Sequence, residues 1–260
     1  IKNIIINNEK IINNNYYSKI KVNFNKKKII DYLRKKNLSY IEFFPNKFLI
    51  IIYDKSFIDM SLLSKNNKYY QYLLKNDFNF FNLPNLDLND RYLINYKDID
   101  NINLNKINVL ANKYSSSNII IVTSKKNNKD KYFYESFLIT NNNIIKIKDF
   151  SHNKIDYKEF FTFLKEEVEN EWKIHNSINN EILNSLICSI QYYNLLEIRE
   201  IEKNLKKILS IEKIKLLNLS YQNKNYEISY YGNIEILLKL FKMNNLKILT
   251  ENKLCKISLI

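Results

Sequence analysis

Glycine is almost absent from this sequence of 260 residues, which contains only Gly232. Phosphate-binding loops, dinucleotide fingerprints, nucleophile elbows and EF-hand loops all need glycine at fixed offsets, so the sequence excludes them. It also has only two histidines, His152 and His175, and two cysteines, Cys188 and Cys255, with no HExxH or CxxC spacing. These residues are too few for an ordinary zinc site. We expect no cofactor, no metal and no enzymatic activity.

Long apolar runs are missing as well. The longest, residues 48–53, is far shorter than the roughly 20 residues that cross a bilayer as a helix. We therefore expect no transmembrane segment in this chain. The sequence begins at Ile1 rather than Met, and we expect a segment upstream of it, so these residues leave export open.

Large apolar side chains and lysine dominate what is present. The chain is 45% hydrophobic and 14% aromatic, which predicts a folded protein. Its net charge of +14, from 41 Lys and Arg against 27 Asp and Glu, is compatible with a nucleic-acid or anionic-membrane surface or with compositional drift. The lysines are scattered through every segment, which favours drift.

The first two thirds of the sequence alternate between strand and helix patterns. Residues 2–24 predict a hairpin through Asn13, Asn14 and Asn15. Further strands are expected over 48–53, 78–83, 119–122, 131–138 and 144–147, and helices over 29–38 (with Asn25 as N-cap), 66–76, 107–114 and 157–174. This rhythm predicts a mixed sheet covered by helices in a domain of residues 1–178.

The remaining residues, 179–260, read as β-α-β-β-α-β, the order of a ferredoxin-like domain. The expected strands are 185–193, 211–220, 225–231 and either 246–250 or 254–259, with helices over 195–209 and 233–243. Gly232 falls between a strand and a helix, where a positive φ is most useful. The whole chain is therefore expected to be α/β (α+β).

One loop carries carboxylates that could take part in chemistry. Asp87 and Asp90 follow Pro84 and could form an acid–base or cation site, which would make the protein a hydrolase. Their spacing is generic, and aspartates in loops ordinarily cap helices or accept backbone N–H groups. The structural interpretation is favoured over the functional one.

The two cysteines also allow two interpretations. Cys188 and Cys255 lie on the first and last strands of the ferredoxin-like pattern, which are neighbours in such a sheet. They could form a disulfide, or they could remain buried free thiols, which is the commoner case. Both alternatives stay open at this point.

Nucleic-acid binding is the competing class of function. A ferredoxin-like unit that binds RNA needs stacking aromatics on its central strands. Residues 226–231 contain aromatics but lack the glycine context of that motif. We expect no nucleic-acid partner, and a basic protein for nucleic acid or anionic surfaces is the alternative.

Several segments resemble a bacterial family, the domain of unknown function 2066. Residues 83–90 are similar to its Leu-Pro-x-x-Asp-Leu-x-Asp segment. Residues 17–24 followed by 29–38 resemble its opening strand and helix, and residues 45–53 resemble its apolar strand with a proline. Two further segments also resemble it: residues 111–114 before the strand at 119–122, and Tyr231-Gly232 before Leu237, Leu238 and Leu240. The chain departs from the family at residues 115–117, where serines replace a glycine-containing turn.

The resemblance implies a location and a kind of partner, but no reaction. The family has no established activity, so no catalytic residue is carried over. It implies an exported, periplasmic or envelope-associated protein that binds an envelope protein not identified by the sequence. The first domain is also similar in fold to the N-terminal domains of envelope assembly proteins, which is analogy alone.

Overall fold

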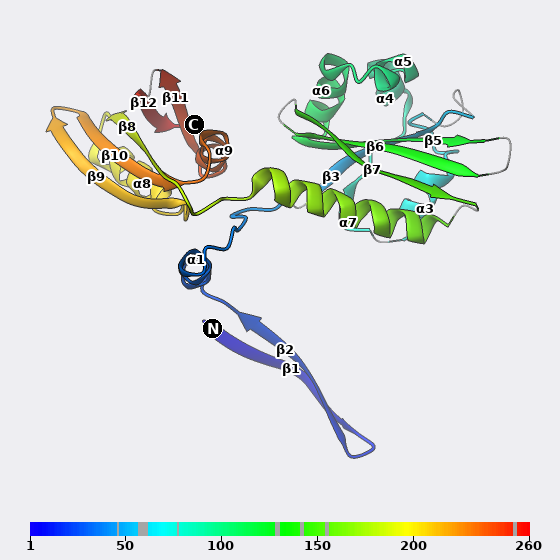
Figure 1. Ribbon diagram of the computed structural model, residues 1–260, viewed down its shortest axis with the longest axis horizontal. Helices are drawn as coiled ribbons and strands as arrows, with labels where there is room; N and C mark the ends of the chain where they lie inside the picture. Colours follow the sequence, from blue (N-terminus) through cyan, green and yellow to red (C-terminus); the bar gives the residue numbers. More distant parts are fainter. Residues whose placement is uncertain are drawn as a thin grey trace. The chain divides into compact units, whose positions relative to one another are not determined.

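The computed structural model describes residues 1–45, 47–56, 62–76, 78–127, 131–140, 143–153, 156–251 and 254–260. In these residues, helices combine with one two-stranded sheet and two five-stranded sheets (Figure 1). The expected α/β class is confirmed. Within the same residues, no helix is long and apolar enough to cross a membrane.

The chain divides into two compact units that differ from the expected domains. Residues 43–175 form one, which we call the central unit, and residues 1–42 together with 176–260 form the other, the split unit. The boundary expected after residue 178 falls close to the observed break at 175/176. The expected assignment of residues 1–42 to the same domain as 43–175 is not what the contacts give.

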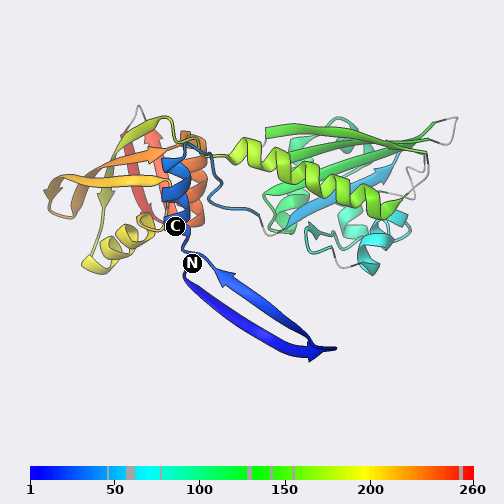
Figure 2. The same cartoon turned by 60° about the horizontal axis from the view of Figure 1, so that its bottom comes forward.

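The central unit is built on a mixed sheet of strand order β4-β3-β5-β6-β7. Strand β3 (Phe48–Asp54) is parallel to β4 (Phe81–Asn82) and β5 (Asn118–Lys126), and the hairpin β6 (Tyr132–Thr140) and β7 (Asn143–His152) continues it antiparallel. Helices α3 (Lys68–Lys75) and α7 (Tyr157–Asn176) lie on one face, and α4 (Leu88–Leu93), α5 (Tyr96–Asp100) and α6 (Leu104–Lys113) on the other (Figures 1 and 2). The expected mixed sheet with helices is confirmed.

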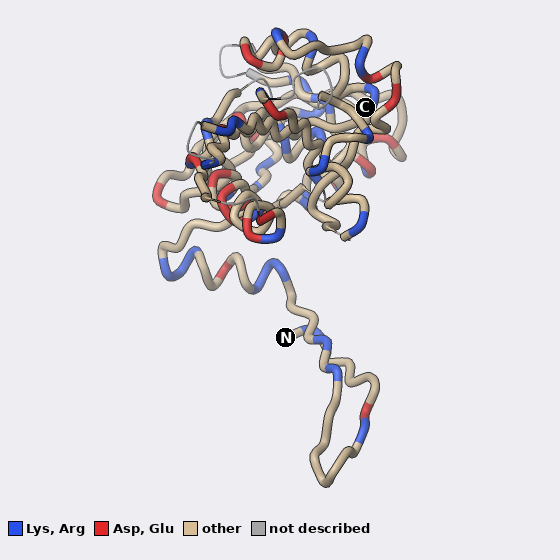
Figure 3. Tube along the Cα trace, turned by 90° about the vertical axis from the view of Figure 1, so that its right-hand side faces the viewer, with Lys and Arg blue, Asp and Glu red and all other residues tan. Residues whose placement is uncertain are grey.

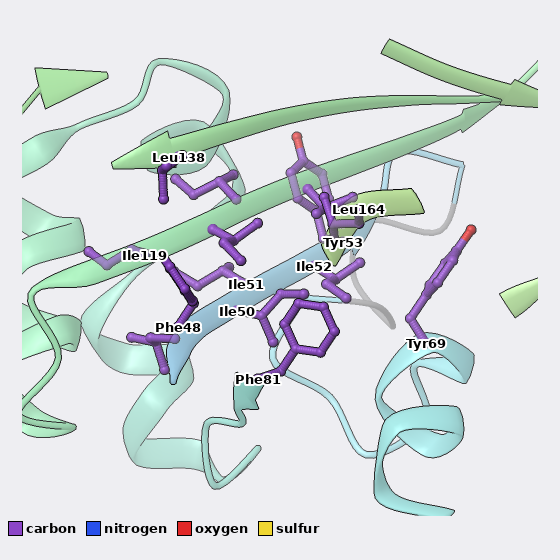
Figure 4. Close-up of a cluster of buried hydrophobic side chains, with 14 of the residues drawn as sticks. Phe48, Ile50, Ile51, Ile52, Tyr53, Tyr69, Phe81, Ile119, Leu138 and Leu164 are labelled. Carbon is purple, nitrogen blue, oxygen red and sulfur yellow. The ribbon is translucent and has the colours of Figure 1, made fainter. Parts of the chain in front are cut away.

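The core of this unit surrounds β3, whose residues Phe48 to Tyr53 are completely buried (Figure 4). A continuous apolar strand of this kind needs cover on both faces, which the two helical layers provide. From α7, Phe160 stacks on Tyr134 of β6 at 4.3 Å between ring centroids. Trp172 meets Phe48 edge-on at 5.7 Å.

Two features of the central unit were not expected. Helices α4 and α5 occupy a region predicted as loop, and each begins at an Asx cap: Asp87 accepts from the Asp90 N–H, and Asn95 from the Asp98 N–H. They have six and five residues, too short to show helical periodicity in sequence. The strand expected over 78–83 is reduced to the two residues of β4.

The split unit contains the second five-stranded sheet, of order β11-β12-β8-β10-β9. Its elements are β8 (Leu183–Gln191), α8 (Leu195–Leu205), β9 (Ile211–Ser220), β10 (Asn223–Tyr231), α9 (Ile234–Met243), β11 (Leu246–Glu251) and β12 (Leu254–Leu259). The β-α-β-β-α-β order is present, and both segments offered for the last strand are strands.

The arrangement of these last two strands departs from the ferredoxin-like expectation. Strand β12 lies between β11 and β8, parallel to β8 and antiparallel to β11. Strand β11 therefore runs parallel to β10, as a crossover through α9 requires, but two strands separate them instead of the one of a split βαβ unit. The order of elements along the chain is the expected one, but the arrangement of strands in the sheet is not that of a ferredoxin-like domain.

Residues 34–42 attach the N-terminal part to this sheet. The Arg34 guanidinium pairs with Glu212 at 2.7 Å, donates to the Leu209 carbonyl at 2.6 Å and lies 4.5 Å from the Tyr231 ring centroid. The Glu42 carboxylate accepts from the backbone N–H groups of Leu209 and Ser210. Burial raises the pKa of Glu42, although these hydrogen bonds act in the opposite direction. Such long-range polar contacts explain why residues 1–42 belong to the split unit.

The expected role of Gly232 is confirmed, since its φ is +86°. This left-handed region penalises residues that carry a Cβ. A Cβ at this position would also lie 3.2 Å from Cγ2 of Ile178. Glycine is therefore required here by both backbone conformation and space.

Candidate functional site

The N-terminal hairpin is the least covered part of the described chain. Strands β1 (Asn3–Ile12) and β2 (Asn15–Asn23) form a sheet of their own (Figure 1). Asn13 and Asn14 have φ of 48° and 60°, the paired positive values of a type I′ turn. The hairpin expected from the asparagine turn is confirmed. The structure then leads to helix α1 (Lys26–Lys35), which begins at the expected cap Asn25.

A β-bulge aligns the apolar side chains of this hairpin. Between the pairs Asn7↔Lys19 and Lys10↔Tyr17, two residues of β1 face one residue of β2. The extra residue, with Asn8 at a φ of 54°, reverses the alternation of β1. Without it, Ile11 would point to the opposite face from Ile4 and Ile6, since side chains alternate along a strand.

One face of the hairpin consequently carries six apolar side chains, arranged as three cross-strand pairs. These pairs are Ile4↔Val22, Ile6↔Ile20 and Ile11↔Tyr16, and we call them the hairpin apolar face. Their exposed fractions range from 37% for Val22 to 76% for Ile11. This face also carries polar side chains in its middle. Ser18 belongs to the same alternating set of β2, and a hydrogen bond with the Glu9 carboxylate raises the pKa of Tyr16, so Glu9 lies on this side as well.

The opposite face of the hairpin carries its lysines. Lys10, Lys19 and Lys21 alternate with the residues of the hairpin apolar face and therefore point the other way. They share that face with three apolar residues that are also exposed: Ile5, Ile12 and Tyr17. The lysines are visible along the hairpin in Figure 3.

An apolar surface of this size is unfavourable in water. Each of the six side chains of the hairpin apolar face is at least 37% exposed. The largest apolar patch on a typical monomer measures about 300–600 Å² and is often functional. Isolated two-stranded hairpins are also marginally stable and gain stability when a face is packed. The hairpin apolar face is thus a candidate binding surface.

The carboxylates of the Pro84 loop have structural partners instead. Asp90 is fully buried and accepts from Lys113 Nζ at 2.6 Å, the Tyr114 hydroxyl at 2.6 Å and the Leu86 N–H at 3.2 Å. Asp87 caps α4 through the Asp90 N–H at 2.9 Å. Pro84 is buried beside them. This geometry uses both oxygens of Asp90 within the fold and favours the structural interpretation.

The two cysteines are bonded to each other. Cys188 of β8 and Cys255 of β12 are directly opposite in the parallel pair, with Cα atoms 4.4 Å apart, and they form a disulfide. Both residues are buried. Of the two interpretations left open by the sequence, the structure has the disulfide.

A cavity of about 440 Å³ lies at the carboxyl ends of β3 and β5 in the central unit. At this end of the sheet the chain leaves β3 for β4 on one side and β5 for β6 on the other. Ligands of open α/β sheets usually bind at such a point. Its lining combines charged and aromatic side chains: Lys55, Thr123, Lys125, Phe133, Tyr134, Glu135, Asp149, Phe150 and Ser151.

Most of the charged side chains around this cavity form ion pairs with one another. Lys55 pairs with Asp100 at 3.0 Å and Glu135 at 4.0 Å, and Lys146 pairs with Glu135 at 3.8 Å and Asp149 at 3.2 Å. Burial would raise the pKa of Asp100, but hydrogen bonds from neighbouring groups outweigh it and lower that pKa. A network satisfied in this way is a weaker candidate for ligand binding than the hairpin.

The described strands of the second sheet also bear on nucleic-acid binding. On the central strand β10, the aromatic residues Tyr226 and Tyr230 are buried, while Asn225, Glu227 and Ser229 alternate with them and remain partly exposed. Stacking of RNA bases needs aromatic rings on the open face. Two of the three aromatics that suggested RNA binding in the sequence therefore belong to the core. The third, Tyr231, is partly exposed and has the Arg34 guanidinium over its ring.

The described residues contain no group of three or more His, Cys, Asp or Glu that could hold a metal ion. Comparisons with protein-family models, with curated proteins and with solved structures find no match. The resemblance to the domain of unknown function 2066 remains a prediction from short segments. The candidate site therefore rests on the chain's own geometry.

Proposed function

We propose that this protein is a non-enzymatic interaction protein of the bacterial cell envelope that binds a partner protein through the hairpin apolar face. The observation that carries the proposal is this uncovered face, with Ile11 76% exposed and its cross-strand partner Tyr16 59% exposed. Sequence reasoning found the hairpin but missed its exposure. The alternation of Ile4 and Ile6 was a signal for one apolar face, but it did not tell what covers that face.

The disulfide supports the location in the envelope. Disulfides persist in oxidising compartments such as the bacterial periplasm and are rare in the cytosol. The buried pair Cys188–Cys255 agrees with export, as does the resemblance. Locating the full-length gene product in the cytoplasm would contradict this part of the proposal.

Site-specific photocrosslinking tests the binding surface. The photoreactive amino acid p-benzoylphenylalanine is placed at Ile20 on the hairpin apolar face, or at Lys19 on the opposite face as the matched control. In cells that express the full-length gene product, we expect covalent protein adducts from position 20 and few from position 19. Equal yields from both positions, or no protein adduct from position 20, would contradict a protein-binding role for this face.

A further inference from the structure

The sheet of the split unit carries a cavity of about 460 Å³ on the face opposite the disulfide. Cys188 and Cys255 are buried on one face of this sheet, so their strand neighbours Ser189 and Lys256 point to the other, which we call the open face. Strands β11, β12, β8 and β10 form the floor of the cavity. Its volume lies within the roughly 300–1,000 Å³ of pockets that bind small ligands.

This cavity is separate from the contacts that attach residues 34–42. Arg34 lies over the ring of Tyr231, the last residue of β10, whereas Asn223, the first residue of that strand, lines the cavity. Because a strand rises about 3.3 Å per residue, the two ends of this nine-residue strand lie about 26 Å apart. The cavity therefore needs an explanation of its own.

One end of the cavity is positively charged. On the open face, Lys247 of β11 is opposite Ser258 of β12, and Lys256 is opposite Leu249. The two lysines are thus diagonal neighbours, about 7–8 Å apart, a distance at which long side chains can reach one common group. Both are exposed, and within the described part of the chain neither has an ion-pair partner. This end suits an anionic group.

The other end of the cavity offers acceptors. Glu197, in the first turn of α8, uses one carboxylate oxygen to accept from the Tyr193 N–H at 2.8 Å and has no ion-pair partner among the described residues. The Tyr192 N–H donates to the Gln222 carbonyl, which brings this segment beside Asn223. Oδ1 of Asn223 is buried and has no hydrogen-bond donor in the described structure. An orphaned acceptor is costly, so this end suits a cationic donor.

We infer that the cavity binds a short peptide by its two free ends, with the terminal carboxylate at Lys247 and Lys256 and the terminal ammonium at Glu197 and Asn223. Strand β8 separates β12 from β10, so the two ends of the cavity lie about 10 Å apart. An extended peptide spans about 3.3–3.6 Å per residue, so three residues bridge that distance.

Two exposed apolar side chains can accommodate those of the peptide. Tyr193, which is 84% exposed, lines the cavity at the acceptor end, and Leu249, which is 58% exposed, lines it at the lysine end. Burying apolar surface of a ligand against them contributes to affinity without adding charge. A tripeptide with apolar residues at both ends therefore matches the cavity in length, charge and polarity.

Other anionic ligands match the cavity less well. Inorganic phosphate would contact the lysines but would leave the buried Oδ1 of Asn223 without a donor. A nucleic acid would bring several phosphates to the open face, where Glu197 and Glu227 would repel them. A ligand with one charge of each sign satisfies both ends at once.

Isothermal titration calorimetry of the full chain with the tripeptide Phe-Ala-Leu tests the inference. We expect saturable binding of one peptide per chain. The N-acetylated peptide lacks the ammonium and the C-amidated peptide lacks the carboxylate. Each should bind about 10-fold or more weakly than the free peptide, because hydrogen bonds to a charged group are lost at one end.

Variants of the protein assign each end of the peptide to its end of the cavity. Lys256→Gln should weaken binding of the free peptide by about 10-fold and leave the affinity for the amidated peptide unchanged. Glu197→Gln should weaken binding of the free peptide but not of the acetylated one, and glutamine can still accept from the Tyr193 N–H. Circular dichroism confirms that the variants are folded.

Lys215→Gln is the matched control. Lys215 is opposite Glu227 and therefore lies on the open face, but it does not line the cavity. This variant should bind the free peptide as tightly as the wild type does.

Four results would overturn the inference. The tripeptide could fail to bind even at millimolar concentration, the two blocked peptides could bind as tightly as the free one, or Lys256→Gln and Lys215→Gln could lose affinity equally. Inorganic phosphate could also bind as tightly as the tripeptide, which would make the cavity an anion site. No residue of the hairpin lines the cavity, so each of these results would leave the proposed function to its own test at position 20.

Discussion

The carboxylate of Asp90 offers a direct test of whether its loop is structural. Asp90→Asn keeps the size of the side chain but removes the charge and one acceptor. In the folded protein the carboxylate is completely buried and accepts from Tyr114, Lys113 and the Leu86 N–H. Hydrogen bonds to a buried charged group contribute about 1.5–3 kcal/mol each. Lys113 is 31% exposed, so water replaces part of its contribution.

From these contacts we expect Asp90→Asn to lower the free energy of unfolding by about 2–4 kcal/mol, a large part of the roughly 5–15 kcal/mol typical of a folded protein. Asp87→Asn is the matched control, because asparagine caps a helix as well as aspartate does. Its ion pair with Lys113 spans 3.8 Å between partly exposed groups, so its loss should cost less than about 1 kcal/mol.

Equilibrium unfolding in urea, followed by the fluorescence of Trp172, measures this difference. Trp172 is the only tryptophan in the sequence, is 2% exposed and packs in the core of the central unit, the unit to which Asp90 also belongs. A loss of less than about 1 kcal/mol for Asp90→Asn, the range of an exposed ion pair, would refute the structural role. So would equal losses for the two variants.

Three further predictions concern the split unit. Gly232→Ala should destabilise it by about 1–2 kcal/mol because of the positive φ, as urea unfolding monitored by circular dichroism will show. Replacing Cys188 and Cys255 by alanine should cost about 4 kcal/mol in the chain-entropy model, and intact-mass analysis after alkylation without reduction should find no modified thiol in the wild type. Burial would raise the pKa of Glu202, but hydrogen bonds from Lys224 and Tyr226 outweigh that effect and lower it. Its contribution to stability is therefore complete above the ordinary glutamate pKa and is lost as pH falls through the lowered value. Glu202→Gln should reduce that acid-side loss of stability in urea titrations at a series of pH values.

Periodic elements were predictable because burial of one face leaves a pattern in the sequence. The apolar run at 48–53 and the stripe of α7 are examples. Helices α4 and α5 are too brief to show a period, and their signal was confined to the caps Asp87 and Asn95. Residues 254–259 were predicted as one of two possible last strands, but their position between β11 and β8 left no signal, because a strand has the same alternation at the edge of a sheet as inside it.

Contacts between distant segments could not be predicted from the sequence either. The attachment of residues 1–42 depends on single polar groups, Arg34 and Glu42, which meet partners far along the chain. The hairpin was predictable from its asparagines, but its exposure depends on what the rest of the chain leaves uncovered. Asp87 and Asp90 were predicted to lie in a loop, but Asp87 caps helix α4 and Asp90 lies inside it. The partners of Asp90 became known only in three dimensions.

The interior position of β12 has a consequence for how this protein is made. Residues 254–259 take a place inside the second sheet, between strands β8 and β11. A ribosome releases β8 from its exit tunnel long before it translates β12, so the sheet waits incomplete with one edge of β8 unpaired. That open edge persists until residues 254–259 emerge, a period in which chaperones can bind it. This sheet is therefore completed only after residues 254–259 have left the ribosome.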